Sequence, residues 1–183
     1  MNHILLITIS GEDQPGFTAG LTAILADHSV SILDIGQSVI HATLSLGLLV
    51  ELSENYAGEQ VVEAVRNFAL ERDLRAVTSV VSPESYSYWV EAQGLARYII
   101  TLLARKITSD QIARVTAVIS KHGLNIDSIN RLSGRIPLGE PPALSKACVE
   151  FSARGSIRDS AVFRRELLEV AGVLEVDLAF QQD

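Results

Sequence analysis

The residues best suited to bind a ligand form a short polar turn between an apolar run and a segment with helical periodicity. This turn reads Gly11-Glu12-Asp13-Gln14-Pro15-Gly16. Pro15 restricts the backbone to turn geometry, and Gly16 lets the backbone approach a partner closely. Backbone amides at the start of the next helix, together with the helix dipole, favour a carboxylate or a phosphate. The same residue types also suit a turn without a ligand, and the sequence leaves both interpretations open.

The histidines are further candidates for chemistry, but their positions favour structural roles. His28 and His122 each follow a helical pattern, where the helix dipole stabilises a positive charge. His41 shares a polar run with Asp34 and Gln37, which is either a ligand-facing patch or an exposed strand face. Because no Gly-x-Ser-x-Gly turn accompanies these histidines, we predict no catalytic residues. The single cysteine has no Cys-His cluster near it, so we also predict no metal site.

The composition is that of a globular protein. Of the 183 residues, 48% are hydrophobic and 20% are charged, which is enough apolar surface to fold. A net charge of -7 with scattered basic residues disfavours nucleic-acid binding. The apolar start, residues 1–10, is too short to span a membrane and lacks the basic flank of a signal peptide. We therefore expect a cytoplasmic chain that has neither nucleic acid nor membrane as a partner.

The chain repeats itself once. Residues 26–36, ADHSVSILDIG, match residues 120–130, SKHGLNIDSIN, at an offset of 94 positions, from 122 minus 28. The same offset aligns the apolar run 4–10 with the run 98–104, and we expect the two apolar patterns to correspond without a gap. Each copy is long enough to close its own core, so the repeat indicates a duplicated domain.

Hydrophobic periodicity predicts the order βαββαβ in the first copy. The predicted strands are 4–10, 32–42, 43–52 and 75–81, and the helices are 17–28 and a segment after Gly58. The two middle strands are joined by a tight turn. Alternation predicts that one face of the third strand is formed by Leu44, Leu46, Leu48, Val50 and Leu52.

The second copy gives the same order. Its predicted strands are 98–104, 125–133, 144–154 and 173–180, and its helices are 109–122 and 157–171. Ser109 or Asp110 is expected to cap the first of these helices, and Gly123 to end it in a left-handed conformation. The prolines in 134–143 predict a longer and stiffer hairpin loop than in the first copy.

This order predicts an α+β protein with two ferredoxin-like sandwiches in tandem. We place the first domain at residues 1–83, a linker at 84–96 and the second domain at 97–183. Because this fold supports many unrelated functions, function must be argued from particular residues.

The first strand, the Asp-Gln-Pro-Gly turn, the helix and the following His28-x-Val-x-Ile32 resemble an ACT domain, a module that senses amino acids. The second copy keeps His122-Gly-Leu-Asn-Ile126. Over nearly its whole length the chain, and 20–51 in particular, is similar to the N-terminal region of long bacterial phosphoserine phosphatases. The resemblance implies tandem ACT domains that bind serine, glycine or another small amino acid, form a homodimer and precede a haloacid-dehalogenase-type phosphatase domain.

The resemblance also implies where a ligand would bind. The family's turn after the first strand corresponds to Asp13, Gln14, Pro15 and Gly16, and its polar residues at the second strand correspond to Asn125 and Asp127 in the second copy. Each copy departs from the family pattern. Ser31 stands in the first copy where an Asn is usual, and the second copy has Arg-Lys-Ile-Thr at 105–108 instead of the turn.

The family's catalysis uses an Asp-x-Asp-x-Thr loop and magnesium, and this sequence contains no such loop. We therefore expect no enzyme activity and no cofactor in this chain, and an intact parent that is a phosphoric monoester hydrolase with magnesium in its catalytic domain. The chain ends about where that domain begins in longer relatives. A free-standing tandem ACT regulator, similar to the repressor-accessory proteins of glycine cleavage, is the alternative. An enzyme in its own right is the third hypothesis.

Overall fold

The structure is a computed structural model that describes residues 3–52, 58–135 and 146–182. The chain divides into two compact units, residues 1–88 and 89–183, and each is described here by itself. Most of the hairpin loop that the sequence predicts to be long and stiff, as well as Leu144 at the predicted start of the next strand, lies outside the described residues.

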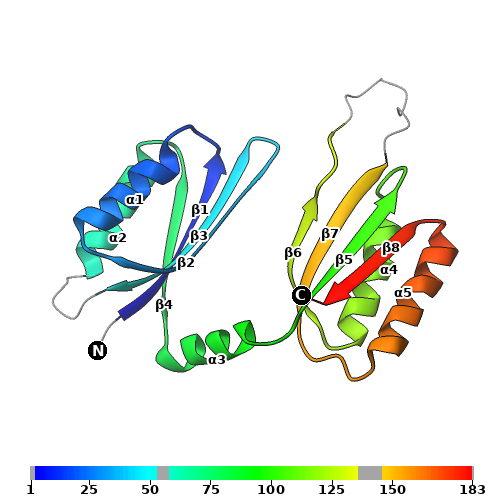
Figure 1. Ribbon diagram of the computed structural model, residues 1–183. Helices are drawn as coiled ribbons and strands as arrows, with labels where there is room; N and C mark the ends of the chain where they lie inside the picture. Colours follow the sequence, from blue (N-terminus) through cyan, green and yellow to red (C-terminus); the bar gives the residue numbers. More distant parts are fainter. Residues whose placement is uncertain (1–2, 53–57, 136–145, 183) are drawn as a thin grey trace. The chain divides into compact units, whose positions relative to one another are not determined.

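The first unit has the predicted order βαββαβ (Figure 1). Its elements are β1 (His3–Glu12), α1 (Phe17–Asp27), β2 (Ser31–Ile40), β3 (Thr43–Leu52), α2 (Gly58–Leu70) and β4 (Arg75–Val81). The strands form one antiparallel sheet in the order β2-β3-β1-β4. Both helices cover the same face of this sheet, and the other face is open. The two-residue turn between β2 and β3 is the tight link that the sequence predicts.

The second unit repeats this arrangement. Its elements are β5 (Arg97–Ala104), α4 (Ser109–Lys121), β6 (Asn125–Arg131), β7 (Ala147–Arg154), α5 (Ser160–Leu174) and β8 (Asp177–Gln182). The antiparallel sheet has the order β6-β7-β5-β8, which matches the first sheet strand for strand. A β-bulge interrupts β2 at Leu33 and β6 at Asp127, so even this irregularity occurs in both copies. The tandem ferredoxin-like fold predicted from the sequence is therefore present.

A helix, α3 (Pro83–Gln93), occupies most of the segment assigned above to the linker. Pro83 stands at its first position, where the missing N–H costs nothing because first-turn amides have no partner within the helix. None of the α3 side chains is fully buried, and the border between the two units falls after Tyr88, within this helix.

Each unit has its own apolar core between its sheet and its two helices. In β3 the alternating residues from Leu44 to Leu52 are all buried, as their period of two predicts. They pack against Leu5, Ile7 and Ile9 of β1 and against the apolar stripes of α1 and α2. The corresponding core of the second unit is built around Ile100, Phe151 and Phe163, which are fully buried.

The expected match of the two apolar runs without a gap is wrong by one residue. The β1 residues of the first core are Leu5, Ile7 and Ile9, and the β5 residues of the second core are Tyr98, Ile100 and Leu102, at an offset of 93. The helices that follow keep the offset of 94, because Leu21 and Val115 are equivalent core residues. The second copy therefore has one more residue between strand and helix. A one-residue slip in a strand exchanges its two faces, so the gap decides which side chains are exposed.

Two boundaries in the second copy also differ from the prediction. Thr108 caps α4, and the expected caps Ser109 and Asp110 lie inside the helix. The last helix begins at Ser160, capped by Asp159, and continues to Leu174, so the expected strand start at Val173 is helical instead. Val173 and Leu174 are apolar and continue the helical pattern of α5 as readily as they would start a strand. Gly123 does adopt the predicted left-handed conformation after α4, with φ of 75°.

Candidate ligand site at the start of helix α1

The turn between β1 and α1 is held on both sides by hydrogen bonds from its own residues. The Asp13 backbone N–H donates to the carbonyl oxygen of Ala42 at 2.8 Å. The Gln14 side-chain amide Nε2 donates to the carbonyl oxygen of Arg72 at 2.8 Å. The amide nitrogen of Gln14, a predicted ligand-binding residue, ties the turn to the loop after α2. Pro15 and the Asp13 side chain are exposed and accessible.

Aromatic packing beneath the turn fixes the position of the helix start. The rings of Phe17 and Phe68 lie 5.3 Å apart between centroids, and the Arg72 guanidinium lies 3.7 Å above the Phe68 centroid. Arg72 also donates from its guanidinium to the carbonyl oxygen of Phe68 at 3.1 Å. The chain of contacts Phe17, Phe68, Arg72 and Gln14 therefore connects α1 to the turn through α2.

Gly16 leaves the start of α1 open. It is the N-cap residue with φ of 81°, a left-handed conformation that favours glycine. Among the described residues, no side chain caps this helix. The amides of Thr18 and Ala19 are in the first turn and have no acceptor within the helix. Their partial positive charge is suited to an anionic group from outside the unit.

The second copy closes the equivalent helix start with its own side chains. The Thr108 hydroxyl accepts from the Gln111 backbone N–H at 3.3 Å, and the Gln111 side chain accepts from the Thr108 N–H at 3.0 Å. This capping box satisfies the N-cap and N3 amides of α4, whereas no side chain of the described residues caps α1. The geometry thus places a candidate anion site in the first copy and an internal cap in the second.

Thr18 and Gln37 add a polar contact beside the open helix start that the sequence analysis did not identify. The Thr18 hydroxyl donates to the Gln37 side-chain oxygen at 2.7 Å, which links α1 to β2. Gln37 pairs with Leu46 and so lies on the helix-covered face, whereas Asp34 pairs with Leu49 on the open face. The polar run of Asp34, Gln37 and His41 is therefore not a single patch. Only the spacing of alternate residues in β2 could have indicated this.

The two second-copy residues lie in the other unit, and one has a structural partner. The Asp127 carboxylate accepts from Arg154 Nε at 2.8 Å, and both side chains are about a third exposed, 30% and 27%. Arg154 also donates to the carbonyl oxygen of Gln93 at 2.6 Å, so the pair anchors the segment before β5. Asn125 is exposed at the start of β6. Asn125 and Asp127 thus belong to the second unit, and Asp13 to Gly16 belong to the first.

Two of the histidines lie at equivalent helix ends. His28 and His122 are the C-cap residues of α1 and α4. His122 is mostly buried, lies edge-on to Phe163 with ring centroids 5.0 Å apart, and has Nε2 at 3.1 Å from a Glu166 carboxylate oxygen. Lys121 donates to the other oxygen at 2.8 Å. The hydrogen bond from Lys121, followed by that from His122, lowers the pKa of the Glu166 carboxyl below its usual value.

In the part of the chain that the structure describes, no three His, Cys, Asp or Glu side chains gather as metal ligands would. Within the same residues, no helix is both long and apolar enough to cross a lipid bilayer.

A family model described as ACT domain matches residues 3–79, which include β1 to β3, both helices of the first unit, most of β4 and the turn that carries the candidate site. The first unit is an ACT domain. The second unit has the same strand order and the same helix positions, so the fold is a tandem of two ACT-like units.

Relatives of this chain include two longer bacterial proteins. The chain is 31% identical over 175 residues to the phosphoserine phosphatase of Streptomyces coelicolor. The aligned region covers 96% of this chain and 39% of that protein. It is also 31% identical over 134 residues to a phosphoserine phosphatase of Mycobacterium tuberculosis, covering 70% of this chain and 31% of that protein. The chain thus spans well under half the length of either relative.

Solved structures share the tandem fold over the full chain. A Galdieria sulphuraria protein superimposes with a TM-score of 0.75 at 16% identity, covering 100% of this chain and 99% of that one. A protein described as a candidate glycine cleavage system transcriptional repressor gives a TM-score of 0.68 at 16% identity, covering 100% and 98%. At this identity the similarity establishes the fold of both units.

Proposed function

We propose that this chain is the amino-acid-sensing and dimer-forming regulatory part of a cytoplasmic phosphoserine phosphatase of serine biosynthesis. The observation that carries the proposal is the similarity to the Streptomyces coelicolor phosphoserine phosphatase across 96% of the chain, which corresponds to 39% of that protein. Phosphate ester hydrolysis, with its magnesium, would belong to the remaining part of such a protein. The ACT units themselves would need no cofactor.

The open start of α1 supports the sensing role. A ligand carboxylate at this position would accept hydrogen bonds from the amides of Thr18 and Ala19, and the helix dipole contributes about 0.3–1 kcal/mol to such an interaction. The exposed Asp13 carboxylate in the same turn is a partner for the ligand's ammonium group. These two groups match the two charges of a small amino acid such as serine or glycine. A ligand of this kind regulates only by binding one arrangement of the protein better than another.

Titration calorimetry tests the sensing role. L-Serine and glycine should release or absorb heat with a saturable isotherm, and Asp13→Asn should weaken this binding about tenfold because the ammonium loses its charged partner. Asp177→Asn is the matched control, since it removes a carboxylate that already pairs with Lys146 and lies outside the predicted amino-acid site. Equal effects of the two substitutions, or no heat with either amino acid, would contradict the proposed site.

The edge of the first sheet supports dimer formation. Strand β2 has ten residues and lies at the sheet edge, so its outer N–H and C=O groups have no partner strand in the unit. It also exposes large apolar side chains, with Ile35 47% and Ile40 78% exposed. In a symmetric homodimer, such an edge is suited to pairing with the same strand of a second copy.

Sedimentation velocity with one charged substitution on each edge tests the dimer. Ile35→Lys places a charge on the β2 edge and should make the chain monomeric, because inward charges on edge strands block pairing. Val80→Lys is the matched control on β4, the opposite edge, where Val80 is 74% exposed. A wild-type chain that sediments as a monomer at all concentrations, or a Val80→Lys chain that dissociates equally, would refute pairing through β2.

The full-length match to the candidate glycine cleavage repressor favours a second function, a free-standing tandem ACT regulator acting through a protein partner. The coding sequence after Asp183 separates the two. An in-frame Asp-x-Asp-x-Thr loop within a few dozen codons supports the phosphatase regulator, and a stop codon supports the free-standing one. Turnover of phosphoserine by this chain alone would contradict both.

A further inference from the structure

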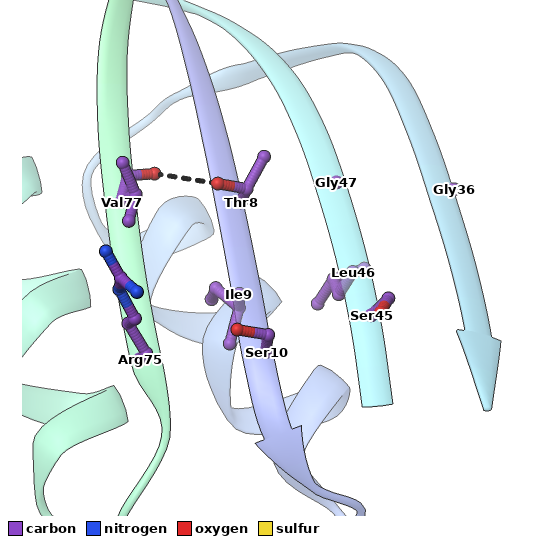
Figure 2. Close-up of a pocket in the computed structure, with 9 residues that line it drawn as sticks. All are labelled: Thr8, Ile9, Ser10, Gly36, Ser45, Leu46, Gly47, Arg75 and Val77. Atoms are coloured by element: carbon purple, nitrogen blue, oxygen red, sulfur yellow. Dashed lines mark hydrogen bonds between the residues drawn. The ribbon is translucent and has the colours of Figure 1, made fainter. Parts of the chain in front are cut away.

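The open face of the first sheet contains a hollow that none of the roles above uses. It has a volume of about 430 Å³ and lies on the face away from the helices, over the end of the sheet where β1 ends and β3 and β4 begin (Figure 2). Side chains from Thr8, Ser10, Ser45, Arg75 and Val77 line it, and Gly36 and Gly47 form part of its floor. The volume is within the range of sites that hold small organic ligands.

The register of the four strands arranges these residues in two rows across the sheet. One row consists of Ser38, Ser45, Ser10 and Arg75, each directly opposite the next. The neighbouring row consists of Gly36, Gly47, Thr8 and Val77. Paired residues in an antiparallel sheet point to the same face, so the hydroxyls and the guanidinium lie side by side on the open face. Next to them, Gly36 and Gly47 form a strip without side chains, here called the glycine strip.

The backbone does not require glycine at either floor position. Gly36 and Gly47 are not among the residues with positive φ, and a Cβ added to either would meet no atom within 4 Å. Glycine inside a strand weakens it, and a position where the fold does not need it indicates that a ligand or another backbone approaches closely. Two such glycines facing each other across β2 and β3 therefore indicate an approach to this face.

The second unit fills the same two rows with other chemistry. In the order of the strands, the residues equivalent to Ser38, Ser45, Ser10 and Arg75 are Leu132, Cys148, Leu103 and Asp177. Those equivalent to Gly36 and Gly47 are Asn130 and Glu150, so the second sheet carries side chains where the first has the glycine strip. Asp177 reverses the charge of Arg75 and already pairs with Lys146 at 3.1 Å. The hollow is thus a property of these residues and not of the fold.

Arg75 is the charge that such a site would use. Its side chain is exposed at the end of the serine row, and in the part of the chain that the structure describes no carboxylate lies within ion-pair distance of it. A guanidinium in this position is suited to a two-point contact with a carboxylate or a phosphate. Ser10, which is directly opposite Arg75, adds a hydroxyl donor, whereas the Thr8 hydroxyl donates to the carbonyl oxygen of Val77 at 3.4 Å.

We propose that this hollow binds a small organic anion with a flat body, at a site separate from the start of α1. The anionic group contacts Arg75 and Ser10, and the flat body lies on the exposed peptide groups of Gly36 and Gly47. A ligand of this shape explains the cation, the hydroxyl row and the two glycines together. The two copies would then recognise different partners through their open faces.

Amide chemical-shift titration of the whole 183-residue chain tests the site, with benzoate, phenyl phosphate and neutral benzamide as probes. We expect saturable shifts at the Gly36 and Gly47 amides with the anions at roughly millimolar concentrations, and none with benzamide. The stronger of the two anions shows whether the site prefers a carboxylate or a phosphate. Arg75→Gln should weaken the binding about tenfold. Arg66→Gln, an exposed arginine on α2, is the matched control and should leave the affinity unchanged.

A second variant tests the site by changing its shape and leaving its charge unchanged. Gly47→Val should abolish the shifts without lowering the thermal midpoint, because the added side chain fills the glycine strip but meets no neighbour and suits a strand. The proposal is overturned by an absence of shifts with both anions, by equal binding of benzamide, or by anion binding that survives Arg75→Gln and Gly47→Val. Shifts at Gly36 and Gly47 that depend on protein concentration alone would overturn it in favour of a second copy on this face.

Discussion

Replacement of Gly20 by alanine tests the packing that positions the candidate site. Gly20 lies in α1 facing α2, and a Cβ at this position would lie 2.4 Å from Cζ and 3.0 Å from Cε2 of Phe68. The Phe68 ring must therefore move. That ring packs on Phe17 and carries the Arg72 guanidinium, and the Arg72 carbonyl oxygen accepts the hydrogen bond from Gln14. One methyl group should thus disturb the turn through a chain of contacts.

Two opposing effects set how much Gly20→Ala changes the free energy of unfolding. Alanine is better than glycine in a helix interior by about 1 kcal/mol. Overpacking costs about 1–3 kcal/mol, and displacement of the ring also weakens the aromatic and cation–π contacts, each worth roughly 0.5–1 kcal/mol. We therefore expect Gly20→Ala to lower the free energy of unfolding of the first unit by about 1–4 kcal/mol. We also expect weaker amino-acid binding, because the turn loses its fixed position.

Urea unfolding, followed for each unit by hydrogen exchange of its own peptides, measures this effect. Gly172→Ala is the matched control, since Gly172 lies in α5 and a Cβ there meets nothing within 4 Å. The control should stabilise the second unit by about 0.5–1 kcal/mol from helix propensity alone. If Gly20→Ala stabilised its unit by the same amount, the ring would be free to move aside, and the proposed mechanical link between Phe68 and the turn would be wrong.

Three further substitutions have defined outcomes. Thr108→Ala removes half of the capping box and should lower the stability of the second unit by about 1 kcal/mol in urea unfolding. Glu166→Gln should reduce the loss of stability at acid pH. Because the folded-state pKa of Glu166 lies below the usual 4.5, the stabilisation from its carboxylate is complete above pH 4.5 and is lost as the pH falls through the lower value. The control Glu169→Gln should leave this loss unchanged. Leu48→Ala, at a fully buried position, should cost the first unit about 2–5 kcal/mol in the same assay.

Much of the fold follows from local patterns. The alternation from Leu44 to Leu52 requires one buried face, and the apolar spacing of Phe17, Leu21 and Leu25 requires a helix, so strands and helices could be placed to within a few residues. The repeat then required two similar units. The turn from Asp13 to Gly16 could also be located, because proline and glycine between an apolar run and a helical pattern are typical of a turn.

Other features depended on choices that a local pattern does not resolve. Thr108, Ser109 and Asp110 are all good caps, and only the extended backbone at Thr108 decides which one is used. Val173 and Leu174 suit a helix as well as a strand. The one-residue difference between the copies has no signal in an apolar run such as 98–104, in which both faces of the strand are apolar.

The sequence by itself determined the two-unit fold and the location of the polar turn. Tertiary structure alone decided which residues surround that turn, because Thr18 meets Gln37 and Gln14 meets Arg72 across 19 and 58 positions of sequence. It also decided that Ser10, Ser45 and Arg75 form one row, since strand register joins residues that are far apart in the chain. Local periodicity fixes which face a side chain occupies, but only the pairing of strands and the packing of helices fixes its neighbours.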